Sequence, residues 1–263
     1  MLTEVLRDDW GWNGLVVTDL IMGLRDPVAG LPLGGDRGSL RLHPGDEQLI
    51  ADARAACDRV IVAVMSGGAV VMPWLDSVAA TLMVWYPGSE GGNALADVLL
   101  GQAEPGGRLP FAVPRDEREL TDFDPEAETA TYGLLHGQWH LDAKSTPAHL
   151  PFGHGLGYTA FELGDARLDG DEVIATVRNT GLRPGSAVVQ VYGSVPDSVH
   201  ERPAKRLVGF AKERIAPGTA SNMRVRIDRS LLDLRIDGEW HREDLPIEFS
   251  VGFDAATARR LST

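Results

Sequence analysis

The sequence has little cysteine and no recognisable metal-binding motif. Cys57 is the only cysteine among 263 residues, so no internal disulfide can form, and no group of Cys and His residues has the spacing of a zinc site. We therefore expect neither a metal nor a cofactor. We interpret Cys57 as a small, buried apolar side chain.

Long hydrophobic runs are also missing. The longest ones, residues 60–65 and 69–72, are far shorter than the roughly 20 residues that cross a bilayer. The first residues are polar and acidic, with Glu4, Asp8 and Asp9, which is unlike a secretory signal. We expect a cytoplasmic protein with no membrane partner.

Basic residues are scarce in one part of the chain. The formal net charge is −13 at pH 7. Residues 1–162 hold 10 Lys and Arg against 23 Asp and Glu, whereas residues 163–263 hold 15 of each kind, which suggests two units. An acidic surface repels phosphate backbones, and no basic stripe with interleaved aromatics is found, so we expect no nucleic-acid partner.

The middle of the chain has an alternating helix and strand pattern. Helices are predicted at residues 47–56 and 94–100 and a helix-like stretch at 75–80, with buried strands at 60–65 and 81–85. Helices that alternate with fully apolar strands indicate a parallel sheet covered on both faces. Residues 114–150 are polar and acidic, contain little that could pack, and are predicted to wrap over the surface.

From residue 161 onward the pattern becomes all-β. Short apolar strands are separated by Gly, Pro, Asn and Asp turns; they are predicted at residues 173–177, 187–192, 207–212, 223–227 and 247–251. This spacing is typical of a small β-sandwich.

The N-terminal part holds one candidate strand and a long irregular segment. Residues 15–17 form a β-branched, apolar run between turn signals, as in a strand buried on both faces, and Thr18 and Asp19 follow it. Residues 23–46 contain too many Gly and Pro residues for regular structure and are interpreted as a loop or linker.

Three ordered motifs are more specific than composition. They are residues 11–19 (GWNGLVVTD), residues 85–99 (WYPGSEGGNALADVL) with 105–110 (PGGRLP), and residues 151–161 (PFGHGLGYTAF). Together they resemble the C-terminal part of family 3 glycoside hydrolases of the β-glucosidase type. In that family such motifs form the nucleophile strand, the signature of the α/β sandwich domain and the entry to a fibronectin type III-like domain.

The resemblance implies a fold and three segments. Residues 45–162 would form an incomplete α/β sandwich with a mostly parallel sheet, and residues 163–263 an all-β immunoglobulin or fibronectin III-like sandwich. Residues 1–44 would be the remnant of a barrel strand, with the nucleophile motif and a linker, packed loosely on the outside. The strand at 15–17, without its barrel neighbours, would then expose apolar surface.

Asp19 is the nucleophile that the resemblance implies. A carboxylate at the C-terminal end of a barrel strand faces the site of chemistry, and retaining glycosidases need such a group to attack the anomeric carbon. From the residues alone, Asp19 could instead cap the following turn, because Asp is common after strands.

A retaining enzyme also needs a second carboxyl group, which lies roughly 5–5.5 Å from the first. In the family this acid often sits in a Gly-Glu-Gly-x-Asp-Arg loop, which residues 32–42 (PLGGDRGSLRL) resemble. The match puts Leu33, which cannot donate a proton, at the acid position. Asp36 and Glu47 are nearby carboxyls that solvation or loop capping explains more simply. The general acid and the substrate-binding residues stay unassigned.

Five further residues have structural explanations that weigh more than catalytic ones. Glu90 precedes a predicted helix and is expected to cap its N-terminus. Trp74, Trp85 and Trp139 could stack on a sugar, but indoles more often fill a core or an interface. His154, between two glycines, is interpreted as a turn residue.

The function that the resemblance implies is retaining hydrolysis of terminal β-D-glucosyl or related residues. A (β/α)8 barrel takes roughly 250 residues, and at most one of its strands is present, so we expect weak or no activity from this chain alone. The alternatives are a non-catalytic carbohydrate-binding or partner-completing module, or a fragment of a longer protein. The expected partners are a β-glucoside and either a second copy of the chain or a chain that supplies the barrel.

Overall fold

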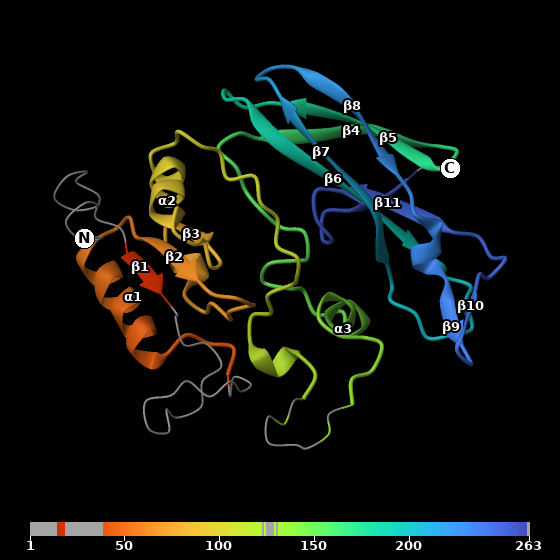
Figure 1. Cartoon of the computed structure of the whole chain (residues 1–263), viewed down its shortest axis with the longest axis horizontal. Helices are drawn as coiled ribbons and strands as arrows, with labels where there is room; N and C mark the ends of the chain where they lie inside the picture. Colours follow the sequence, from red (N-terminus) through yellow and green to blue (C-terminus); the bar gives the residue numbers. More distant parts are fainter. Residues whose placement is uncertain (1–14, 19–38, 123, 125–128, 130, 262–263) are drawn as a thin grey trace. The chain divides into compact units, whose positions relative to one another are not determined.

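The computed structural model describes residues 15–18, 39–122, 124, 129 and 131–261 (Figure 1). The chain divides into two compact units: residues 1–103 with 114–130, and residues 104–113 with 131–263. Residues 131–162 and the motif at 105–110 thus belong to the same unit as the C-terminal strands. The resemblance implies family domains at residues 1–44, 45–162 and 163–263. These domain boundaries stay a prediction.

The first unit contains a three-stranded sheet in the order β1-β2-β3. Its strands are β1 (Leu15–Thr18), β2 (Ile61–Met65) and β3 (Ala80–Met83), and both pairs are parallel. The centre of β2 is fully buried, as expected for an apolar strand between two neighbours. The strand at 15–17 has a neighbour in this sheet, because β1 pairs with β2 along its whole length.

Two helices accompany this sheet in sequence. In α1 (Pro44–Ala56) a proline begins the first turn, and the side chain of His43 accepts a 3.2 Å hydrogen bond from the backbone N of Gly45. The second, α2 (Gly91–Leu99), buries Leu95 and Ala96. The helix-like stretch predicted at 75–80 is only a single 3₁₀ turn, Leu75–Ser77, because β3 already begins at Ala80.

Cys57 caps the C-terminus of α1 and is exposed. The prediction that this thiol is buried is wrong. The helix buries only Ile50, so a position at its end meets solvent rather than the core.

The second unit is built mainly from two antiparallel sheets, ordered β12-β11-β6-β7 and β4-β5-β8, with a separate β9–β10 hairpin. The strands are β4 (Phe161–Asp169), β5 (Glu172–Asn179), β6 (Gly185–Ser194), β7 (Arg206–Ile215), β8 (Ala220–Arg226), β9 (Leu234–Ile236), β10 (Glu239–His241), β11 (Glu248–Gly252) and β12 (Arg259–Arg260).

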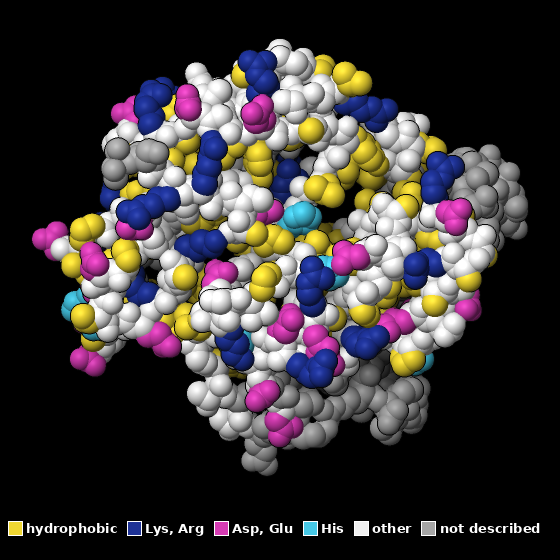
Figure 2. Space-filling model, turned by 180° about the vertical axis from the view of Figure 1, so that it is seen from behind, with side chains coloured by type: hydrophobic (Ala, Val, Ile, Leu, Met, Phe, Trp, Pro, Cys, Tyr) yellow, Lys and Arg dark blue, Asp and Glu magenta, His cyan; other side chains and the backbone are white. Residues whose placement is uncertain are grey.

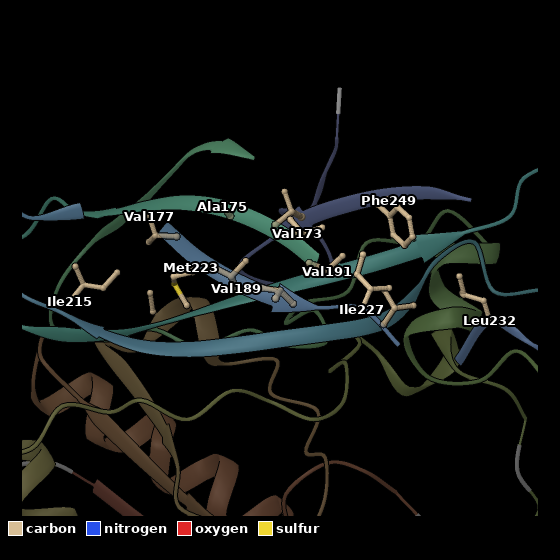
Figure 3. Close-up of a cluster of buried hydrophobic side chains, with 14 residues drawn as sticks. Val173, Ala175, Val177, Val189, Val191, Ile215, Met223, Ile227, Leu232 and Phe249 are labelled. Atoms are coloured by element: carbon tan, nitrogen blue, oxygen red, sulfur yellow. The ribbon is translucent and has the colours of Figure 1, made fainter. Parts of the chain in front are cut away.

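A single cluster of apolar side chains joins the two sheets (Figure 3). Val173, Ala175 and Val177 of β5 alternate with outward-facing residues, as the period of two in a strand requires. They meet Val189 and Val191 from β6, and all five are fully buried. The inward-facing side chains of the two sheets therefore form one shared core.

Residues 131–150 pack more than the sequence suggested. They contain the short helix α3 (Gln138–Ala143), whose Leu141 is fully buried. Val113 and Leu150 form an isolated antiparallel bridge. The prediction that this region holds little that could pack is wrong, because one well-placed leucine anchors the helix.

Charges of both signs share the surface. On the face shown in Figure 2, Lys and Arg side chains lie among Asp and Glu side chains. Among the described residues, no helix combines the length and the apolar character needed to span a membrane.

Candidate functional site

The predicted catalytic positions Asp19 and Leu33 lie outside the described residues, as does Asp36. Asp19 directly follows Thr18, the last residue of β1. The structure therefore describes the strand that leads to the predicted nucleophile.

The strand ends define one edge of the first unit's sheet, which we call the carboxyl edge. Thr18 pairs with Met65, and Val64 pairs with Met83, so β1, β2 and β3 end at the same side. In open parallel sheets ligands bind outside the carboxyl ends of the strands. The segments that follow these ends are thus the candidate site of the first unit.

Ser66 is the first residue after β2 and is fully buried. Its hydroxyl donates to the carbonyl oxygen of Gly68 (2.9 Å) and accepts from the backbone N of the same residue (3.2 Å). The hydroxyl therefore closes a turn.

Tyr86 lies over this turn. A Cβ atom built on Gly67 would be 2.7 Å from Cε2 of Tyr86, so only glycine lets the ring approach so closely. Tyr86 is 59% exposed, and Trp85 before it has a φ of 60°. The carboxyl edge thus presents an aromatic ring to solvent.

Glu90 occupies the N-cap position of α2, but its side chain makes no capping hydrogen bond. Its Oε2 instead accepts a 2.8 Å hydrogen bond from Nδ2 of Asn93. The predicted position is right and the predicted contact is wrong.

Glu47 and Glu117, two carboxylates close to the predicted acid loop, accept hydrogen bonds from residues 39–41. Glu47 accepts from Nε of Arg41 at 3.0 Å, and the hydrogen bond and charge of Glu47 raise the pKa of Arg41. Glu117, which no sequence signal singled out, accepts from Ser39 Oγ (2.9 Å) and Leu40 N (2.8 Å). These contacts fix residues 39–41, so they favour the structural interpretation of Glu47.

The three tryptophans differ in their surroundings. Trp74 is buried, with 8% of its surface exposed, which agrees with a core role. Trp85 is half-buried at the carboxyl edge. Trp139, on α3, lines a cavity of the second unit.

Two of the sequence motifs meet inside the second unit. The backbone N of Leu109 donates to the carbonyl of His154 (2.9 Å), and the N of Gly153 donates to the carbonyl of Leu109 (2.8 Å). A Cβ on Gly155 would overlap the carbonyl oxygen of Gly107. Gly155 is therefore needed for the close approach of the two backbones.

His154 has more than a turn role. Its Nδ1 lies 3.4 Å from Oδ2 of Asp254, whose other oxygen accepts from the backbone N of Thr257 (2.7 Å). Burial disfavours the charge of Asp254, but the hydrogen bonds from His154 and Thr257 outweigh it and lower its pKa. The pair joins the motif at 151–161 to the end of the chain.

Within the described ranges, no three His, Cys, Asp or Glu side chains gather in a way that could hold a metal ion.

The comparisons with known proteins identify the family. Residues 16–158 match the C-terminal domain of glycosyl hydrolase family 3, and residues 187–255 match a fibronectin type III-like domain. The first match covers more than half of the chain, so the chain belongs to glycosyl hydrolase family 3. The family predicted from the three motifs is confirmed.

The curated relatives are β-glucosidases. The β-glucosidase of Rhizobium radiobacter is 40% identical over 211 residues, which are 74% of this chain and 26% of the relative. β-Glucosidase B of Emericella nidulans is 35% identical over 245 residues, 83% of this chain and 29% of the relative. The chain thus spans less than a third of the length of these relatives.

Solved structures agree with this assignment. DesR, a β-glucosidase from Streptomyces venezuelae in complex with D-glucose, has a TM-score of 0.80 at 28% identity, over 99% of this chain and 35% of its own. The β-D-glucoside glucohydrolase of Trichoderma reesei has a TM-score of 0.80 at 25% identity, over 94% and 39%.

Proposed function

We propose that this chain is a truncated family 3 β-glucosidase with weak or no activity by itself. Its inherited reaction is retaining hydrolysis of terminal β-D-glucosyl or related residues. The observation that carries the proposal is the match to β-glucosidases over 26–29% of their length. A (β/α)8 barrel takes roughly 250 residues and most of the relatives' length lies outside the matched part, so the proposal places the barrel in another chain or in a longer form.

In this proposal Asp19 is the nucleophile. Its carboxylate attacks the anomeric carbon while the glycosidic C–O bond breaks, which gives a glycosyl ester that water then hydrolyses. Leu33 stands where the leaving oxygen should be protonated. General acid catalysis contributes about 10²–10⁴-fold, so its absence alone would make the hydrolysis of ordinary glucosides slow.

The same proposal includes the finer architecture. The first unit is an incomplete, mostly parallel α/β sandwich, and the second is an immunoglobulin-like sandwich of the fibronectin III-like type. The parallel pairs β1–β2 and β2–β3 and the shared core of the two antiparallel sheets support it.

Hydrolysis of an aryl β-glucoside by the purified chain tests the function. We expect very weak or no release of the aryl group, and any release should disappear in Asp19→Asn. Robust turnover that this substitution abolishes would contradict the loss of competence. Turnover that it leaves unchanged would contradict Asp19 as nucleophile.

The second candidate function is a non-catalytic module, which binds carbohydrate or completes a barrel from another chain. Two features favour this candidate over an autonomous enzyme. The chain keeps the strand that leads to Asp19, and it has leucine at the proposed acid position. Binding of a glucoside without its hydrolysis would support it.

A further inference from the structure

A cavity of about 360 Å³ lies within the second unit, and the proposed hydrolysis does not use it. It lies between α3, the segment of residues 110–112 and strands β6 and β7. Its volume is at the lower end of the range for small-ligand sites, roughly 300–1,000 Å³. Aromatic rings form much of its wall: Phe111, Trp139, Phe152 and Tyr192.

Asp142 gives this cavity an unusual acceptor. Its Oδ1 accepts a 2.8 Å hydrogen bond from Nε2 of Gln138, one helical turn earlier. Gln138 is held in turn by the backbone N of Phe152, which donates to its Oε1 at 2.9 Å. Oδ2 of Asp142 is buried and has no hydrogen-bond partner within the described part of the chain. A buried carboxylate oxygen without a donor is unfavourable, and Asp142 lines the cavity, so its carboxylate is the acceptor offered to a ligand hydroxyl.

Donors come from the segment at the start of β7. The guanidinium of Arg206 lies 5.6 Å from the ring centre of Trp139, and among the described residues its side chain has no hydrogen bond or ion pair. Lys205 donates through Nζ to the carbonyl of Ala255 and lies 5.8 Å from the ring centre of Tyr192. The cavity thus combines one free acceptor with one free cationic donor group.

Tyr192 adds a buried phenol to the cavity wall. The tyrosine is buried, and its hydroxyl donates to Oε1 of Gln190 at 2.6 Å. Burial, and then the charges of Asp254 and Asp142, raise the pKa of Tyr192. The phenol therefore stays neutral and keeps its donor role at physiological pH.

The charges restrict the class of ligand. An anion would be repelled by Asp142 and a cation by Arg206 and Lys205. A purely apolar molecule would leave Oδ2 of Asp142 without a donor. A neutral ring with several hydroxyls and apolar C–H faces satisfies the acceptor, the donor and the aromatic wall together.

We propose that this cavity binds a neutral sugar ring, packed against Trp139, with a hydroxyl donating to Asp142 and an oxygen accepting from Arg206. This is a non-catalytic carbohydrate site in the second unit, beyond the hydrolysis proposed above. A second cavity of about 400 Å³ shares Trp139, Arg206 and Leu231 with the first and extends to the exposed Trp240. The site thus accommodates a second sugar residue.

The test is saturation-transfer NMR on the purified full chain, with D-glucose and cellobiose as probes. We expect transfer to both sugars, with cellobiose bound more tightly. Asp142→Asn and Trp139→Phe should each weaken binding by about tenfold or more, as expected for a lost hydrogen bond to a charged group or a reduced stacking surface. Asp169→Asn, an exposed aspartate of the same unit, is the matched control and should bind as the unsubstituted chain does.

The Asp19→Asn variant separates this site from the proposed catalytic one. Sugar binding should persist in it, whatever happens to hydrolysis. The proposal is overturned by absence of transfer to both sugars, by binding that Asp142→Asn and Trp139→Phe leave unchanged, or by binding that is lost in Asp19→Asn. Circular dichroism confirms that each variant is folded.

Discussion

Asn179 ends β5 and holds the turns around it with its side chain. The residue is fully buried. Its Nδ2 donates to the carbonyls of Arg183 (2.8 Å) and Ile215 (2.9 Å). Its Oδ1 accepts from Thr159 Oγ1 (2.6 Å) and from the backbone N of Gly181 (3.0 Å). All four hydrogen-bonding positions of the amide are therefore filled.

Replacing this amide leaves several buried groups without partners. We expect Asn179→Ala to lower the free energy of unfolding by about 2–3 kcal/mol, because orphaned buried groups carry their full desolvation cost. Urea denaturation measures the loss. Asn222→Ala, an exposed asparagine on β8, should change the stability by less than about 0.5 kcal/mol. Equal effects of the two substitutions would contradict the role of Asn179.

Asp254 makes stability depend on pH. Because its folded-state pKa is lowered, its contribution is fully present above the ordinary aspartate pKa of about 3.9 and is lost as the pH falls through the lower folded-state value. The stability difference between the unsubstituted chain and Asp254→Asn should therefore be larger at pH 6 than at pH 3. Urea denaturation at both values measures it, and a difference that does not shrink in acid would contradict the assignment.

Single residues also mark a limit of sequence-based prediction. Glu90 was placed correctly at a helix start, but its contact with Asn93 depends on rotamers. Asp142 gave no signal, because the burial of its Oδ2 depends on distant segments that enclose the cavity. Asp19 and Leu33 lie outside the described residues, so their roles stay predictions.

At the scale of elements, Gly153 joins a motif to a strand. Its φ is +83°, in the region that favours glycine, and an added Cβ would overlap the side chain of Gln190. That side chain cannot easily move, since its Nε2 donates to the carbonyls of Gly153 (3.1 Å) and Phe253 (2.6 Å).

In Gly153→Ala, the backbone strain at positive φ adds to the overlap of the new Cβ with Gln190. We expect a loss of about 2–4 kcal/mol in the free energy of unfolding. Gly107→Ala is the control: a Cβ there meets no atom within 4 Å, and its effect should stay below about 0.5 kcal/mol. Thermal denaturation of both variants measures the two losses. If Gly153→Ala leaves the stability unchanged, the contact between Gly153 and Gln190 is not rigid.

Elements were predictable where apolar residues recur regularly. The five strands predicted in this part overlap β5, β6, β7, β8 and β11, because their inward side chains fill one core. β4 (Phe161–Asp169) was missed because most of its residues are polar or exposed. α3 (Gln138–Ala143) was missed because a six-residue helix with one buried leucine leaves no periodic pattern.

At the scale of the whole chain, the family and its domain order were predictable and the pairing of β1 was not. The motifs are local and specific, whereas the partner of a strand is set by long-range contacts. Residues 15–17 were expected to be without barrel neighbours, and nothing in their sequence indicated the parallel pairing of β1 with β2. Asp19 therefore follows a strand that belongs to the first unit's sheet.

The proposed role of Asp19 can be tested apart from the proposed loss of the general acid. The groups that hold a sugar in near-attack geometry belong to barrel strands and loops, so we expect reaction only when a barrel fragment of a homologous β-glucosidase is mixed with this chain. The probe is a 2-deoxy-2-fluoro glucoside with a dinitrophenolate leaving group, which departs without protonation and so does not need the general acid whose position we propose for Leu33.

Mass spectrometry should find a glycosyl ester on Asp19 in the mixture, none in the isolated chain, and none with Asp19→Asn. Within that complex, Leu33→Glu should then restore hydrolysis of glucosides with poor leaving groups by about 10²–10⁴-fold, the usual contribution of a general acid. It should leave labelling by the activated probe nearly unchanged, because that step requires only the nucleophile. A stable complex without labelling at Asp19 would contradict complementation, and the chain would then be an inert remnant of its family.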